Sequence, residues 1–240
     1  MKKLLVMIAL FFMIGLNSFA QNTDKRFMVL NELKVKDMEL WRKNMSVYNP
    51  LMKEKFKGIL ADRTQQRSET GFIYSLGFIN GTENLGKYFT MRNDGSNDFG
   101  LTNPKIYQEM SANWDGPFRR STWILVSGNL PDDFKRENYK FRKILIETIP
   151  TDKQEEYEKR WVESRKLLSK LGVNTLSVTW KAVDGYTTST YLTMFPDTSI
   201  DDYYKHRAER IQKKEFAEFI KNNLKTTVIR IDHLYTEFLF

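Results

Sequence analysis

The chain contains two histidines and no cysteine, so imidazole chemistry is limited to two positions and thiol chemistry does not occur. The absence of cysteine excludes thiolate nucleophiles, Cys-ligated zinc and iron–sulfur clusters. No Gly-x-Ser-x-Gly elbow, Gly-rich phosphate loop or His-Glu-x-x-His motif occurs. The two histidines, His206 and His233, are too far apart in the sequence to indicate zinc. Catalytic residues therefore stay unknown at this level, and no metal site is predicted.

Residues 226–238 alternate as a β-strand does, which places His233 on one face with Ile229 and Ile231. Because that face is apolar, we expect the His233 side chain to be at least partly buried, with Trp180 in its neighbourhood. Two interpretations remain open. His233 is either a core histidine satisfied by one hydrogen bond, or a ligand or proton-transfer group.

The other histidine lies in a helix predicted over residues 199–223. The apolar residues of this helix recur with helical spacing and are predicted to face the core: Ile200, Tyr204, Ala208 and Ile211. At about 100° per residue, His206 falls well off that face. We therefore expect His206 to be a solvated surface histidine.

Trp180 points inward if residues 174–182 form a strand, because it then shares a face with apolar neighbours. The next predicted strand, 185–195, has hydroxyl-bearing side chains on both faces. This pattern favours either a semi-polar cavity or a partly exposed sheet edge. The predicted pocket would hold a small apolar or aromatic molecule. Its candidate ligand-binding residues are His233, Trp180 and Tyr191.

The sequence repeats itself at a near-constant offset. Residues 29–32 (Val-Leu-Asn-Glu) precede residues 144–147 (Ile-Leu-Ile-Glu) by 115 positions, and each set opens a predicted strand followed by an amphipathic helix. The same offset relates two further sets in a later helix: Leu85, Tyr88 and Phe89, and Ile200, Tyr203 and Tyr204. A shared offset across several elements indicates an internal duplication.

Each half is predicted to follow the order β-α-β-β-α-β. The predicted strands are 27–35, 57–66, 71–79, 118–127, 141–149, 174–182, 185–195 and 226–238. The predicted helices are 37–55, 151–171 and 199–223, with another from Glu83 that a loop at 93–97 interrupts and that resumes near Pro104. Asp184-Gly185 predicts a hairpin, and the segment from Ser127 to Tyr139 is the natural linker. Strand 226–238 is expected to pair with strand 174–182.

Two such units in one chain resemble the dimeric α+β barrel superfamily in a fused, tandem form. That family includes antibiotic-biosynthesis-type monooxygenases, haem-degrading monooxygenases and chlorite-dismutase-like haem proteins. The resemblance is one of element order, without a shared motif. It implies an α+β fold with two tandem ferredoxin-like units, a first repeat over 21–130 and a second over 131–240. It leaves haem open as a cofactor, although no histidine here aligns with a proximal ligand.

The N-terminus has the pattern of a secretory signal peptide. Two lysines precede an apolar run over residues 4–15, and Ser18 and Ala20 supply the small residues that a signal peptidase needs. The run is shorter than the roughly 20 apolar residues of a transmembrane helix. We expect residues 1–20 to be removed before Gln21, leaving an exported periplasmic or extracellular protein without an integral membrane segment. An uncleaved anchor is the alternative.

Composition limits the function classes further. The chain is 41% hydrophobic and 14% aromatic, which is sufficient for a packed core. The formal net charge is +8, but basic and acidic residues alternate along the chain rather than clustering, so no nucleic-acid partner is expected. Two functions follow, and a purely structural envelope protein stays open as a third. The first is an exported protein that binds a small ligand in an α+β-barrel pocket, and the alternative is a monooxygenase or haem-linked oxidoreductase of the same fold.

Overall fold

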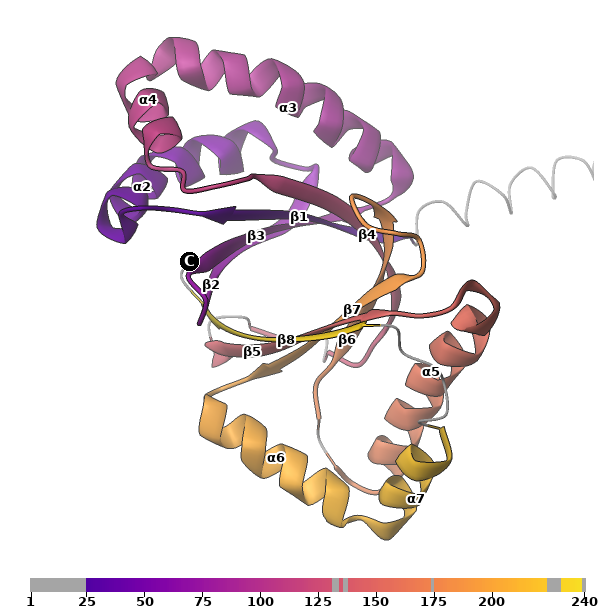
Figure 1. Ribbon diagram of the computed structural model, residues 1–240. Helices are drawn as coiled ribbons and strands as arrows, with labels where there is room; N and C mark the ends of the chain where they lie inside the picture. Colours follow the sequence, from indigo (N-terminus) through magenta and orange to yellow (C-terminus); the bar gives the residue numbers. More distant parts are fainter. Residues whose placement is uncertain (1–24, 131–133, 136–137, 174, 224–229, 239–240) are drawn as a thin grey trace, which may run out of the picture. The chain divides into compact units, whose positions relative to one another are not determined.

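The computed structural model describes residues 25–130, 134–135, 138–173, 175–223 and 230–238 (Figure 1). Within 93–102 and 230–238 only the backbone is described. The strands are β1 (Arg26–Lys34), β2 (Leu60–Ser68), β3 (Phe72–Asn80), β4 (Arg119–Gly128), β5 (Phe141–Thr148), β6 (Val178–Asp184), β7 (Thr190–Asp197) and β8 (Arg230–Phe238). The helices are α2 (Met38–Lys55), α3 (Thr82–Thr102), α4 (Pro104–Ala112), η2 (Thr151–Lys153), α5 (Gln154–Lys170), α6 (Ile200–Gln212) and α7 (Lys214–Asn223).

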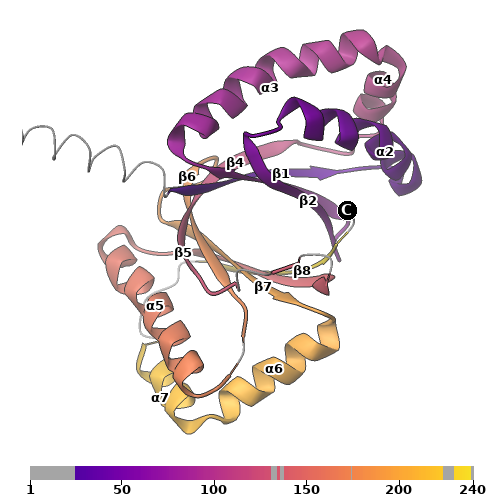
Figure 2. The same cartoon turned by 180° about the vertical axis from the view of Figure 1, so that it is seen from behind.

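The strands form a closed barrel in the order β1-β3-β2-β8-β5-β7-β6-β4. Each strand pair whose register is described is antiparallel. Figures 1 and 2 show these strands from opposite sides. The predicted α+β class is confirmed, and the sheet closes on itself as the barrel resemblance implied.

One expected strand pairing is wrong. Strand β8 pairs with β5 and β2, whereas β6 pairs with β7 and β4, so β8 does not lie beside the segment 174–182. The reason is the order of strands in a β-α-β-β-α-β unit. Its first strand, here β5, lies between the third and the fourth, which keeps the second and fourth strands apart.

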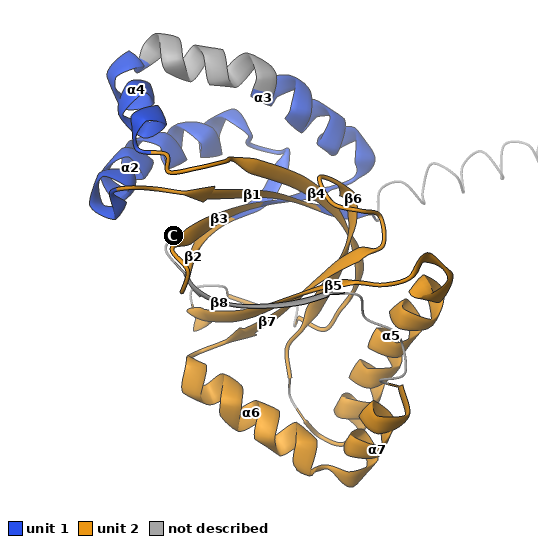
Figure 3. Cartoon of the chain, in the orientation of Figure 1, with its two compact units in different colours: residues 1–27, 37–63, 77–113 blue, residues 28–36, 64–76, 114–240 orange. Residues whose placement is uncertain are grey.

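The chain divides into two compact units (Figure 3). The described part of the first unit is 25–27, 37–63 and 77–113, and it contains α2, α3 and α4. The second unit holds 28–36, 64–76 and the described residues from 114 onward. It contains most of the barrel strands, and its helices α5, α6 and α7 lie outside strands β5 to β8 (Figures 1 and 2).

Local signals explain where the long helices begin and end. Helix α2 begins after Asp37, whose carboxylate accepts hydrogen bonds from the backbone N–H groups of Glu39 and Leu40 at 2.8 and 3.0 Å. Gly172 follows the end of α5 with a φ of +69°, a conformation that favours glycine. Residues Thr151–Lys153 form η2, and α5 begins after them without a side-chain cap.

Two predicted helix boundaries are also wrong. The loop expected at 93–97 is absent, and α3 runs through these residues despite their low intrinsic helix propensity. The long helix expected over 199–223 is divided into α6 and α7 by Lys213, whose backbone is extended with a ψ of 111°. Neither change alters the order of elements within the two halves.

The core-facing side of α6 is the opposite of the predicted one. The apolar residues at helical spacing point outward: Ile200 is 46%, Tyr204 44% and Ile211 56% exposed. The buried residues of this helix are Tyr203 and Arg210. The helical spacing correctly indicated an apolar face on this helix, but the face that packs against β7 is a different one.

The connection between β6 and β7 is longer than the predicted two-residue turn, because β7 begins only at Thr190. It still requires Gly185, whose φ is +80°. A Cβ atom at this position would lie 2.3 Å from the backbone oxygen of Arg120, so no other residue fits without a backbone shift.

We predict that Gly185→Ala lowers the free energy of unfolding by about 2–4 kcal/mol, since it combines a strained φ with a backbone clash. The matched control is Gly86→Ala within α3, where a new Cβ meets nothing within 4 Å. That variant should gain up to about 1 kcal/mol. Urea unfolding of both variants checks the prediction, and equal effects of the two substitutions would contradict it.

Candidate functional site

The register of β6 and β7 assigns each side chain to one face of the sheet. Thr179 and Lys181 of β6 contact side chains of α5, with Lys181 Nζ 2.8 Å from Glu158 Oε1. Trp180 lies between them in sequence and so faces the inside of the barrel, where it is buried. Tyr191 of β7 pairs with Lys181 and its hydroxyl donates to Glu158 at 2.6 Å. Tyr191 therefore faces the helices.

Two of the three residues predicted to line one pocket, Trp180 and Tyr191, are thus not brought together. Trp180 and Tyr191 are both buried, but they lie on opposite faces of the sheet. His233 lies on β8 opposite Leu145 of β5, and its side chain is outside the described residues. Its predicted burial and its role stay predictions. Trp180 is buried inside the barrel, and Tyr191 is buried between the sheet and the helices.

The hydroxyl groups that suggested a cavity or a sheet edge have another explanation. Strand β7 is not an edge strand, because it pairs with β5 on one side and β6 on the other. Its Thr193 hydroxyl lies 3.0 Å from that of Thr179, which in turn accepts a hydrogen bond from buried Arg165. Arg165 also donates to Ser177 and Ser127. These hydroxyls satisfy a guanidinium inside the sheet–helix layer, where burial lowers the pKa of Arg165 to about 10.

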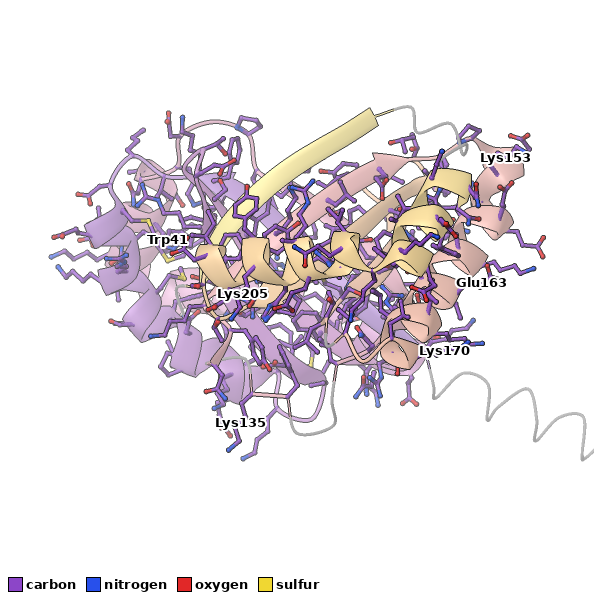
Figure 4. All side chains as sticks on the ribbon, turned by 90° about the horizontal axis from the view of Figure 1, so that it is seen from below. Trp41, Lys135, Lys153, Glu163, Lys170 and Lys205 are labelled. Atoms are coloured by element: carbon purple, nitrogen blue, oxygen red, sulfur yellow. The ribbon has the colours of Figure 1, made fainter. Side chains whose placement is uncertain are left out.

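A cavity of about 220 Å³ does exist between α6 and the end of β7, on the helix-facing side of the sheet. Four residues supply most of its apolar wall: Tyr139, Leu176, Phe195 and Tyr203. The Phe195 and Tyr203 rings pack with their centroids 6.4 Å apart. Figure 4 looks onto this helix layer, with Lys205 marking α6 and Glu163 marking α5. The wall suits a flat, apolar ligand surface.

The polar side of the cavity contains a histidine–aspartate pair. His206 Nδ1 lies 2.9 Å from Asp197 Oδ2, and both residues line the cavity. Because an ionised carboxylate only accepts hydrogen bonds, the contact assigns a proton to Nδ1, and in the neutral imidazole Nε2 is then the acceptor. Asp197 is buried by the end of β7, while the His206 side chain is 39% exposed. The pair is an oriented imidazole that can take up a proton.

Arg210 completes the polar side. It is 9% exposed, and its guanidinium lies over the Phe195 ring at 5.7 Å from the centroid. Burial lowers the pKa of Arg210, while the nearby Asp197 carboxylate acts in the opposite direction. Together, Tyr203, His206 and Arg210 occupy successive turns on one side of α6, which is the side that the sequence assigned to solvent.

His206 was expected to be a solvated surface histidine, and its side chain is 39% exposed, but its place at a cavity was not foreseen from the sequence. It lines a cavity and pairs with an acidic residue nine positions earlier. A signal was present in the sequence: Tyr203, His206 and Arg210 follow one another at helical spacing and form a second, amphipathic face of α6. Residues of this kind bury their stems while keeping a polar end available. Choosing between the two faces required the position of β7.

A second polar pair in this layer is sealed from the cavity. Tyr157 of α5 donates a hydrogen bond to Glu147 Oε2 of β5, and its ring packs on Tyr191 with centroids 4.6 Å apart. Burial raises the pKa of Glu147 and, together with the Glu147 charge, raises that of Tyr157. Neither residue lines the cavity, so we assign the pair a structural role.

This burial predicts a pH dependence of stability. A carboxyl group whose pKa is raised by folding is stabilising below its unfolded pKa, near 4.5, and loses that stability as the pH rises through its folded pKa. Glu147→Gln cannot ionise, so its stability relative to the unsubstituted protein should improve as the pH rises from below 4.5 toward neutrality. Thermal unfolding across this range measures the difference.

Tyr157→Phe is the matched control for the carboxyl group. The Tyr157 hydrogen bond lowers the pKa of Glu147, so its removal should extend the stability loss to higher pH. A difference between Glu147→Gln and the unsubstituted protein that stays constant with pH would contradict the argument.

Comparison with known proteins finds no matching family model and no matching curated sequence. Several solved structures share the fold. One is a protein of Fusobacterium nucleatum assigned provisionally as a monooxygenase (TM-score 0.60, 12% identity, 90% of this chain and 94% of that chain). Another is an anthrone oxidase-like protein (TM-score 0.57, 12% identity, 90% and 92%). A third is a chlorite dismutase variant of Candidatus Nitrospira defluvii (TM-score 0.52, 9% identity, 90% and 91%).

These likenesses define the class of protein by its fold. The chain has the dimeric α+β barrel fold that monooxygenase-like and chlorite-dismutase-like proteins share. At such identities the likeness extends to the fold alone. Activity must therefore be argued from the residues at the cavity.

The residues that the structure describes contain no group of three or more acidic or histidine side chains that could hold a metal ion. None of their helices combines the length and the apolar character that crossing a bilayer requires. His206 has the carboxylate partner typical of a metal-ligating histidine. However, the 220 Å³ cavity beside it is smaller than ordinary drug-sized pockets of about 300–1,000 Å³, and the larger haem macrocycle does not fit it.

Proposed function

We propose that this protein binds a small ring compound in the cavity between α6 and β7. The observation that carries the proposal is the His206–Asp197 contact of 2.9 Å at a partly enclosed, aromatic-walled cavity. A packed protein interior rarely leaves such a space beside polar groups without a use. This proposal retains the small apolar or aromatic ligand expected from the sequence and moves its site from the Trp180–Tyr191–His233 set to α6.

The size of the cavity limits the ligand. A dry cavity of about 150 Å³ is enough to hold benzene. The 220 Å³ available here therefore suits a single ring with one or two substituents. Phe195 and Tyr203 supply aromatic surfaces for the ring, and His206 offers Nε2 to an acidic hydroxyl or C–H group.

We predict that a fragment screen followed by thermal unfolding identifies ring compounds that raise the melting temperature. His206→Ala should abolish most of that rise, because the oriented acceptor is lost. The variant should change stability without ligand by less than about 1 kcal/mol, since the contact of His206 with Asp197 is partly solvated. Lys205→Ala, an exposed neighbour on the same helix (Figure 4), is the control and should respond as the unsubstituted protein does.

The same compounds distinguish binding from the alternative function. An imidazole held by a carboxylate beside a ring compound is the arrangement that deprotonating a weakly acidic substrate needs. A monooxygenase would consume dioxygen in the presence of the bound compound, and His206→Ala would remove that consumption. Binding without oxygen consumption supports the binding function, whereas compounds that bind equally well to His206→Ala would contradict the site itself.

We also propose that the chain is two copies of one ferredoxin-like unit, over 21–130 and 131–240. The proposal is supported by the element order, since β1-α2-β2-β3-α3/α4-β4 and β5-α5-β6-β7-α6/α7-β8 follow the same pattern. The strand order also contains β8-β5-β7-β6 as one continuous half of the barrel. The half-barrels would then correspond to two chains of a single-unit relative.

Export remains a proposal that rests on the sequence. The lysine pair, the short apolar run and the small residues before Gln21 support cleavage after Ala20. N-terminal sequencing of protein from the exported fraction should therefore read Gln-Asn-Thr-Asp. A sequence that begins at Met1 in that fraction would contradict cleavage.

A further inference from the structure

Arg210 is a buried cation without an ion pair in the described part of the chain. It is 9% exposed and lines the cavity, and no carboxylate of the described residues lies within salt-bridge distance of it. The nearest candidate, Asp197, is committed elsewhere. Its Oδ2 lies against His206 Nδ1 and its Oδ1 accepts the N–H of Thr198 at 2.9 Å. Burial disfavours the charged guanidinium, and within the chain only the Tyr203 hydroxyl and the charge of Asp197 act in the opposite direction, without an ion pair among the described residues.

Thr175 makes a second, independent contribution to the same cavity. It is 8% exposed and lines the cavity, and its hydroxyl oxygen has no hydrogen-bond partner among the described residues. Its backbone groups are satisfied, because its N–H donates to Val173 and its carbonyl accepts from Asn129. A buried hydroxyl without a partner is uncommon in folded proteins and indicates a group that a ligand can satisfy.

We infer that the ring compound proposed above carries a carboxylate, which Arg210 holds at the cavity with the Thr175 hydroxyl as a further donor. This inference rests on the proposed function and names the chemical class of its ligand. A planar guanidinium matches the two oxygens of a carboxylate, and such pairs are strong when they are sheltered from water. The charge of Arg207, close to Arg210 on α6, adds to the attraction for an anion.

The ligand then has two ends with different partners. Its aromatic ring lies against Phe195 and Tyr203, and its carboxylate meets Arg210. Asp197 also lines the cavity and keeps its negative charge, although its two oxygens accept hydrogen bonds from His206 and Thr198, so the carboxylate of the ligand must lie toward Arg210 and away from Asp197. A cationic or neutral ring of the same size would leave Arg210 without a counter-charge and should bind more weakly.

Benzoate and benzamide test the inference on the full chain without any substitution. The two have the same ring and nearly the same shape, but only benzoate is charged. Titration calorimetry should show benzoate binding about tenfold more tightly or better, because a charge-assisted hydrogen bond contributes more than a neutral one. Equal affinities would overturn the carboxylate assignment while leaving the proposed ring-binding site intact. Failure of both compounds and of all other single rings would overturn the proposed function itself.

Substitutions test whether Arg210 and Thr175 hold the carboxylate of the ligand. Arg210→Gln should remove the preference for benzoate over benzamide, and Lys205→Gln, which removes an exposed charge from the outer side of α6, should keep it. Because Arg210 packs on Phe195 and its loss can disturb folding, Thr175→Val gives a second reading with little change in volume. That variant should weaken benzoate binding several-fold with an unchanged melting temperature of the unliganded protein. A preference for benzoate that persists in Arg210→Gln would overturn the assignment.

Discussion

The pairing of β5 with β7 is the constraint on which the rest of the second unit depends. The two strands run antiparallel through eight consecutive pairs, from Phe141 opposite Asp197 to Thr148 opposite Thr190. Because side chains alternate, this register decides which residues face the helices and which face the barrel interior. A shift by one residue would turn Asp197 away from His206 and Glu147 away from Tyr157. The candidate site and the buried acid–phenol pair therefore share one origin.

Several charged side chains are buried in the layer between this sheet and its helices. Three of them have different surroundings. Arg165 is surrounded by hydroxyl groups of Ser127, Ser177 and Thr179. Glu147 accepts a hydrogen bond from a buried phenol. Arg210, by contrast, lines the cavity. It contacts Tyr203 and the Phe195 ring but has no ion pair among the described residues, which is why we propose that an anionic ligand completes its surroundings.

Much of the fold could be predicted from the sequence, because the signals are local. Alternation located all eight strands to within a few residues, and the repeat indicated the same element order in both halves. Predictions failed where one local sequence pattern is compatible with two different backbone structures. The Asn93–Asn97 segment has turn-like composition but continues α3, and the Asp184-Gly185 pair begins a longer connection than a two-residue hairpin.

The candidate site was the least predictable part, for a physical reason. Helix α6 has two faces at helical spacing, an apolar one with Ile200 and Ile211 and an amphipathic one with His206 and Arg210. Hydrophobicity favours burying the first, yet the aromatic Tyr203 and the stem of Arg210 bury the second against β7. By itself the sequence determined the element types, their order and the absence of thiol chemistry. Only the tertiary structure decided which face of α6 is inside, because that choice depends on the total packing of the sheet–helix layer and not on any single helix.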